Sequence, residues 1–236
     1  DRTIQYYRVT IEHMLKRITI PLRQIATEDI RQYLIDYQKI NNCGKVTIDN
    51  IRRNLSSFFS WLEEEDHILK SPVKRIHKIK TKTVVKEVIS DESIEILRDN
   101  CKEKRDLAII DLLFSTGMRV GELVNLDIAD IDFNERECIV YGKGDKERLI
   151  QIGNDAVIHI LEEYKNNYHS EIQNCKHFFA NQSGNALSDQ AVRRMINKYT
   201  SLAAIDLHIT PHMFRHTFAT CLLEADVDIR YIQEML

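Results

Sequence analysis

Glycine, proline and long apolar stretches are scarce in this 236-residue sequence. It has 7 glycines and 3 prolines, which argues against a fibrous or low-complexity chain and favours ordered helices. No apolar run is long enough to cross a bilayer, and the N-terminus lacks the order of a signal peptide. The 43% hydrophobic and 29% charged residues therefore predict a soluble, helix-rich protein of one or two domains, with no membrane partner.

Cysteine pairs with the spacing of a disulfide framework or a zinc finger are also lacking. The five cysteines lie far apart, are odd in number and include no CxxC pair. This pattern is typical of neither class of protein. A reducing compartment fits it best, so we expect a cytoplasmic protein.

Charge is unevenly distributed although the net charge is only −3. Residues 1–83 hold 16 Lys and Arg against 10 Asp and Glu, and residues 84–236 hold 17 against 26. A basic first part joined to an acidic second part indicates that the first part supplies much of any contact with phosphates. Modest charge asymmetry is common, so this observation alone does not identify a nucleic-acid-binding protein.

The hydrophobic periodicity divides the chain into three segments. Residues 1–80 show helical spacing, residues 81–89 form a polar linker, and residues 90–236 mix helical and strand patterns. The predicted fold class is mainly α with a small antiparallel β-sheet. In the first segment a helix is expected to begin with Thr27 as its N-cap. Arg52 and Arg53 flank the apolar stripe of another helix and are either solvated or in contact with phosphates.

The second module has a more varied pattern. We expect a hairpin of two strands at 137–141 and 148–152, with its turn at 142–146. A further short strand is expected at 177–180. Helices are expected at 104–116, from about residue 120, at 154–167, 188–200 and 211–224, and from near Asp228.

Three separated motifs place cationic side chains at the ends of these elements. They are residues 116–123 (TGMRVGEL), 142–148 (GKGDKER) and 210–220 (TPHMFRHTFAT). Each motif alone also fits an ordinary helix junction, a charged turn or a structural His–Arg pair. His216 is interpreted as structural, and Phe214, Phe218 and Leu222 as a core-facing stripe.

Together the motifs supply two arginines, a lysine and a histidine, which suits phosphoryl transfer at a phosphodiester. Guanidinium groups stabilise the negative charge that builds on non-bridging oxygens in the transition state. A lysine protonates a leaving oxygen, and a histidine exchanges protons with the nucleophile or the phosphate. The sequence offers no evident cluster of metal ligands, so we expect neither a metal nor another cofactor.

The order of the three motifs resembles the tyrosine recombinase family, including Xer recombinases and integrases of phages and mobile elements. The resemblance covers nearly the whole chain. It implies a helical, SAM-like core-binding domain over residues 1–80 and a mixed α+β catalytic domain over residues 90–236. It also implies DNA strand exchange through a 3′-phosphotyrosyl intermediate, without ATP.

The resemblance assigns roles to individual positions. Arg119 and Arg215 match the two catalytic arginines, Lys143 matches the general acid toward the leaving 5′ oxygen, and His212 matches the histidine of the His-x-x-Arg pair. Glu122 is expected to brace Arg119 or the local helix.

The family pattern continues past Leu236 to a nucleophilic tyrosine that these 236 residues do not contain. We therefore expect a C-terminally truncated chain that binds DNA without cleaving it, with Tyr231 as a packing residue.

Double-stranded DNA is the expected partner. Phosphate contacts are expected from the basic residues Lys45, Arg52, Arg53, Lys78 and Lys80. The resemblance implies a homo-tetramer on synapsed DNA for the full-length protein, and this fragment is expected to be monomeric when free.

Two other functions remain open: a type IB topoisomerase-like strand-relaxing enzyme, and a non-catalytic DNA-binding regulator on the same fold. The HMFRHT segment and a small four-helix first module favour a recombinase.

Overall fold

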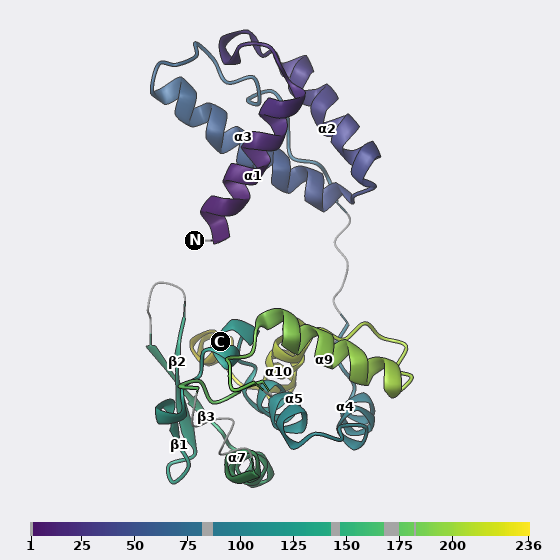
Figure 1. Cartoon of the computed structure of the whole chain (residues 1–236), viewed down its shortest axis with the longest axis vertical. Helices are drawn as coiled ribbons and strands as arrows, with labels where there is room; N and C mark the ends of the chain where they lie inside the picture. Colours follow the sequence, from purple (N-terminus) through teal and green to yellow (C-terminus); the bar gives the residue numbers. More distant parts are fainter. Residues whose placement is uncertain (1, 82–86, 143–146, 168–174, 182) are drawn as a thin grey trace. The chain divides into compact units, whose positions relative to one another are not determined.

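A computed structural model describes residues 2–81, 87–142, 147–167, 175–181 and 183–236. The chain forms two compact units, Asp1–Val85 and Lys86–Leu236, which are drawn in Figure 1 and are considered separately below. The fold is mainly α-helical with one small antiparallel sheet in the described residues, which confirms the predicted fold class. No helix in these ranges is long and apolar enough to span a membrane.

The described residues of the first unit form three α-helices: α1 (Arg2–Arg17), α2 (Thr27–Asn41) and α3 (Lys45–Glu64). Their apolar faces meet in one core, in which Met14, Ile30, Leu55 and Phe59 are fully buried. The predicted fourth helix is absent from the described part of this unit, which instead has a single 3-10 turn, η1 (Leu22–Gln24).

The start of α2 differs from the prediction by one residue. Ala26, not Thr27, is the N-cap residue, and its backbone N–H donates to the Asp29 carboxylate at 2.8 Å. The carboxylate in the first turn thus satisfies the free N–H group from inside the helix, so a capping hydroxyl before the helix is not needed.

Seven α-helices are described in the second unit. They are α4 (Asp91–Asp99), α5 (Lys104–Thr116), α6 (Val120–Val124), α7 (Asp155–Asn167), α9 (Asp189–Leu202), α10 (Pro211–Glu224) and α11 (Ile229–Met235). The apolar helix α5 packs against both α7 and α10, and its residues Ile109, Ile110, Leu112 and Leu113 are almost fully buried. This burial makes α5 the centre of the unit's core, and it fixes the ends of the elements that follow.

The sheet has the strand order β1 (Ile131–Asp132), β2 (Glu137–Tyr141) and β3 (Glu147–Gln151). Strands β2 and β3 are antiparallel, and Tyr141 pairs with Glu147 at the hairpin end. This pairing confirms both predicted strands, with β3 beginning one residue earlier than expected. Within the predicted turn, residues 143–146 lie outside the described residues.

The prediction of a strand at 177–180 is wrong. Among the residues that the structure describes, this segment makes only isolated bridges, Asp127 to His177 and Ala180 to Ala186. Phe178 and Phe179 are fully buried and pack against the ring of Tyr164. Their apolar run reflects burial in the core rather than membership of a sheet, and periodicity alone does not separate the two.

Helix α10 begins with Pro211 at its first position, as predicted, because the fixed φ of proline suits a helix start. The apolar stripe on this helix is only partly a core face. Phe214 is fully buried, but Phe218 and Leu222 are half-buried. The helix therefore lies across the edge of the core.

Candidate anion-binding site

The site begins at Gly117, where α5 ends. Gly117 has a φ of +61°, a conformation that side-chain-bearing residues rarely adopt. A Cβ atom built there would lie 2.5 Å from Cδ1 of Phe218 on α10. Glycine is therefore required for both the turn and the close approach of α10. The next turn carries Arg119, the residue that precedes α6.

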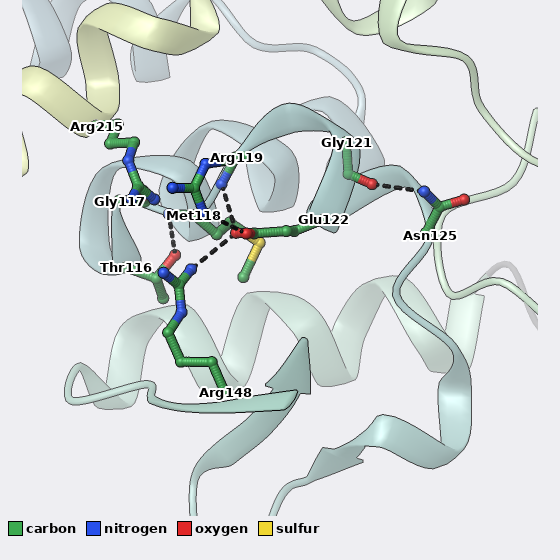
Figure 2. Close-up of polar contacts among 9 residues, drawn as sticks. All are labelled: Thr116, Gly117, Met118, Arg119, Gly121, Glu122, Asn125, Arg148 and Arg215. Atoms are coloured by element: carbon green, nitrogen blue, oxygen red, sulfur yellow. Dashed lines mark hydrogen bonds and ion pairs between the residues drawn. The ribbon is translucent and has the colours of Figure 1, made fainter. Parts of the chain in front are cut away.

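Glu122 on α6 holds Arg119 at two points. Its Oε2 accepts the backbone N–H of Arg119 at 2.9 Å, and its Oε1 accepts Nη1 of the same residue at 2.7 Å (Figure 2). The Glu122 side chain is only 5% exposed, whereas that of Arg119 is 55% exposed. The prediction that Glu122 braces Arg119 is confirmed, and more than half of the Arg119 side chain remains exposed.

A third residue, Arg148 on β3, shares the same carboxylate. Its Nη2 donates to Oε2 of Glu122 at 2.8 Å (Figure 2). The sequence analysis placed Arg148 in a strand but gave it no role at the site. The available signal was strand alternation, because Arg148 lies on the same face as the buried Ile150 and an inward arginine requires a partner.

Arg215 reaches the site from α10. Its Nη1 donates to the backbone carbonyl of Gly117 at 2.9 Å. Burial, and then the positive charges of Arg119 and Arg148, lower the pKa of Arg215 to about 10. Arg215 is thus charged at neutral pH, and it adds a third guanidinium group beside the two, Arg119 and Arg148, that bind the Glu122 carboxylate.

A hollow of about 490 Å³ lies beside these residues. Arg119, His212 and Arg215, all predicted as site residues, lie together on its wall. Tyr141 and Arg193 also line it, and the sequence analysis missed both because nothing in their local pattern links them to the three motifs. Positive charge in a concave site favours an anion. Lys143, the remaining predicted catalytic residue, lies outside the described residues.

The predicted phosphate contacts belong to the first unit and are organised by Asp49 on α3. Its carboxylate accepts Nε of Arg52 at 2.8 Å and the backbone N–H of Ile79 at 3.0 Å. Nη2 of Arg53 lies 3.5 Å from the same carboxylate. The side chain of Arg52 is 13% exposed and that of Arg53 64% exposed, so Arg52 has a structural partner and Arg53 faces solvent.

The bond to Ile79 fixes the segment that carries Lys78 and Lys80 beside α3. Both lysines are exposed, as is Lys45 one turn before Asp49 on the helix. The structure therefore brings these predicted residues to the neighbourhood of one helix in the first unit.

Tyr231 is not a packing residue in the described structure. It lies on α11 and is 66% exposed, while its neighbour Ile232 is buried at 6% exposure. The packing role predicted for Tyr231 is therefore wrong, and Ile232 has that role. Within the described ranges, no group of three or more His, Cys, Asp or Glu side chains is placed to hold a metal ion.

A helical first unit is followed by a mixed unit whose arginine-lined hollow suits an anion such as a phosphate. Residues 67–236 match the phage integrase family, and residues 1–68 match the SAM-like N-terminal domain of phage integrases. The chain belongs to the phage integrase family, whose members include the tyrosine recombinases. This membership supports an enzyme of site-specific recombination.

Curated relatives are similar along nearly all of the chain. A tyrosine recombinase of Agathobacter rectalis is 46% identical over 256 aligned residues, which cover 100% of this chain and 82% of that protein. The tyrosine recombinase XerC of Staphylococcus haemolyticus is 33% identical over 97% of this chain and 78% of its own length.

Solved structures show the same fold. The XerA recombinase is 28% identical with a TM-score of 0.61, over 100% of this chain and 82% of its own. A lambda integrase dimer bound to a COC′ core site is 20% identical with a TM-score of 0.81, over 100% of this chain and 87% of its own.

Proposed function

We propose that this chain binds duplex DNA and holds a scissile phosphate in the hollow of its second unit, as part of a site-specific recombinase. The observation that carries the proposal is the convergence of Arg119 and Arg215 on one hollow beside His212. Two fixed guanidinium groups suit a phosphodiester, whose two non-bridging oxygens share a negative charge.

In this proposal each side chain has a separate task. Arg119 and Arg215 stabilise the charge on the non-bridging oxygens as the phosphorus becomes five-coordinate. His212 exchanges a proton with the nucleophile or the phosphate, and Lys143 protonates the leaving 5′ oxygen. A tyrosine hydroxyl forms the 3′-phosphotyrosyl bond while the O5′–P bond breaks. A second 5′ hydroxyl then reverses this exchange on the new partner strand.

The exposed basic residues of the first unit extend the contact along the DNA backbone. Arg53, Lys78 and Lys80 lie near the Asp49 anchor and Lys45 lies one turn away. Contacts of this kind position a protein on the duplex without reading its sequence. A related lambda integrase structure contains a tetramer bound to a Holliday junction, and we propose the same stoichiometry for recombination by this protein.

Selection from a random duplex pool tests DNA binding. We expect the 236-residue chain to enrich one family of sites and to protect it from nuclease digestion. The Arg119→Ala/Arg215→Ala double variant should bind the selected duplex at least tenfold more weakly. The proposal would be overturned if the selection enriched no sequence and the double variant bound DNA as tightly as the wild-type chain.

We further propose that the 236-residue chain binds this duplex without forming a covalent adduct. The test is a nicked suicide duplex made from the selected site, analysed on a denaturing gel. An adduct would contradict the proposal, and Tyr141→Phe and Tyr231→Phe would then identify the attacking residue. Tyr141 is included because it lines the hollow, and Tyr231 because its ring is exposed. If an adduct forms, a supercoil-relaxation assay separates recombination from topoisomerase-like activity.

A further inference from the structure

We propose that Arg148 is a positioning residue: it holds Glu122 so that Arg119 stays directed at the bound phosphate, without touching the phosphate itself. This inference rests on the proposed function and assigns a role to a residue outside the four predicted catalytic positions.

The burial of Arg148 separates it from the residues open to a ligand. Its side chain is 18% exposed, against 55% for Arg119. It is also not among the described residues that line the hollow, whereas Arg119 and Arg215 are. In Figure 2 Arg148 extends from the strand toward the Glu122 carboxylate, and Arg119 meets this carboxylate from the other side.

The way in which the two carboxylate oxygens are used explains why a second arginine is needed. Oε1 of Glu122 accepts the Arg119 guanidinium, while Oε2 accepts both the Arg119 backbone N–H and Nη2 of Arg148. Charge-assisted bonds on both oxygens fix the plane of the carboxylate. Arg148 also raises the formal charge of this group of side chains from +1, for Arg119, Arg215 and Glu122, to +2, so that an anion is attracted more strongly.

The same contact joins the sheet to α6. Arg148 pairs with Val140, one step from the last described pair of the hairpin, Tyr141 and Glu147. Its bond to Glu122 therefore fixes the turn end of the described β2–β3 hairpin relative to Arg119. Two separate elements that contribute to the proposed chemistry are thus connected through one ion pair.

Dimethyl phosphate, a phosphodiester monoanion, is a suitable probe because it requires no knowledge of the DNA site. We would titrate it into the 236-residue chain and follow the guanidinium ¹⁵N signals of Arg119 and Arg215. Arg148→Met should weaken binding about tenfold and Arg148→Lys about fivefold, because lysine retains the charge but not the planar fork. Backbone amide spectra report whether each variant is folded.

The matched control is Arg136→Ala. Arg136 precedes β2 and forms an exposed ion pair with Asp155, so its loss should change the dissociation constant less than twofold. In a Glu122→Gln background, Arg148→Lys should also have less than a twofold effect, because Arg148 acts through the carboxylate.

Three outcomes would overturn the inference. One is wild-type affinity in folded Arg148→Met, and another is an equal loss in the Glu122→Gln background, which would indicate direct contact with the anion. The third is failure of the wild-type chain to bind dimethyl phosphate. This third result would overturn the proposed function as well, so the two failures are distinguishable.

Discussion

Each unit contains a buried carboxylate that is held by two arginines and one backbone N–H group. In the first unit Asp49 accepts from Arg52, Arg53 and the N–H of Ile79. In the second unit Glu122 accepts from Arg119, Arg148 and the N–H of Arg119. The chemistry of the two clusters is nearly the same, but the elements that supply them differ.

The arginines around Asp49 lie three and four residues later on the same helix, so this cluster stabilises α3 and anchors a neighbouring segment. The partners of Glu122 come from the turn before α6 and from β3, and Arg215 on α10 adds a third positive charge beside them. The comparison shows that a carboxylate–arginine cluster is not itself a site. The Glu122 cluster differs from the Asp49 cluster because it lies beside a hollow and has an excess of positive charge.

The largest expected effect is on stability, from removing either carboxylate. Asp49→Ala and Glu122→Ala should each destabilise their own unit by about 3 kcal/mol, because a buried arginine loses its partner. The free energy of unfolding of each unit is measured by denaturant titration, with a spectroscopic probe placed in that unit. Only Glu122→Ala should also alter dimethyl phosphate binding. A change in this binding from Asp49→Ala would remove the distinction between the clusters.

Gly117→Ala should have the next largest effect, about 2 kcal/mol in the second unit. The added Cβ would occupy a left-handed conformation and meet the ring of Phe218. The shift of α10 should also move Arg215, which donates to the Gly117 carbonyl. The free energy of unfolding of the second unit and its affinity for dimethyl phosphate are measured on the same variant. Gly44→Ala is the control, since nothing lies within 4 Å of a Cβ there, and equal effects would contradict the account.

A smaller effect is expected from acid. The hydrogen bond from Arg52 is the main cause that lowers the pKa of Asp49 to about 2 from its ordinary value of 3.8. Since the folded pKa is the lower one, the carboxylate stabilises the first unit above pH 3.8, and this stabilisation is lost as pH falls toward 2. The loss should be about 2 kcal/mol. Urea unfolding of wild type and Asp49→Asn between pH 2 and 5 tests it, and parallel curves would refute it.

The smallest effect separates the two arginines of the Asp49 cluster. Arg53→Ala should make the fall of log K with log salt concentration less steep by about 0.9, as expected when one phosphate contact of the duplex is lost. Arg52→Ala should change chiefly the stability, because Arg52 is mostly buried against Asp49. Anisotropy titrations at several salt concentrations distinguish them, and a larger salt effect from Arg52 would reverse the assignment.

Sequence periodicity predicted most helices and both hairpin strands, because their apolar faces repeat at regular spacing. It failed at residues 177–180, where Phe178 and Phe179 are buried without a strand partner. The three motifs identified Arg119, His212 and Arg215, which the hollow brings together. Arg148 was missed as a site residue because its partner Glu122 lies 26 positions away, a contact that only the tertiary fold creates.

The most direct test of the central claim is the dimethyl phosphate titration, followed through the guanidinium signals of Arg53, Arg119 and Arg215 in one sample. The account predicts that Arg119 and Arg215 shift together along one saturable curve, while Arg53 changes little. A shift of Arg53 alone, or no saturable shift at Arg119 and Arg215, would contradict it.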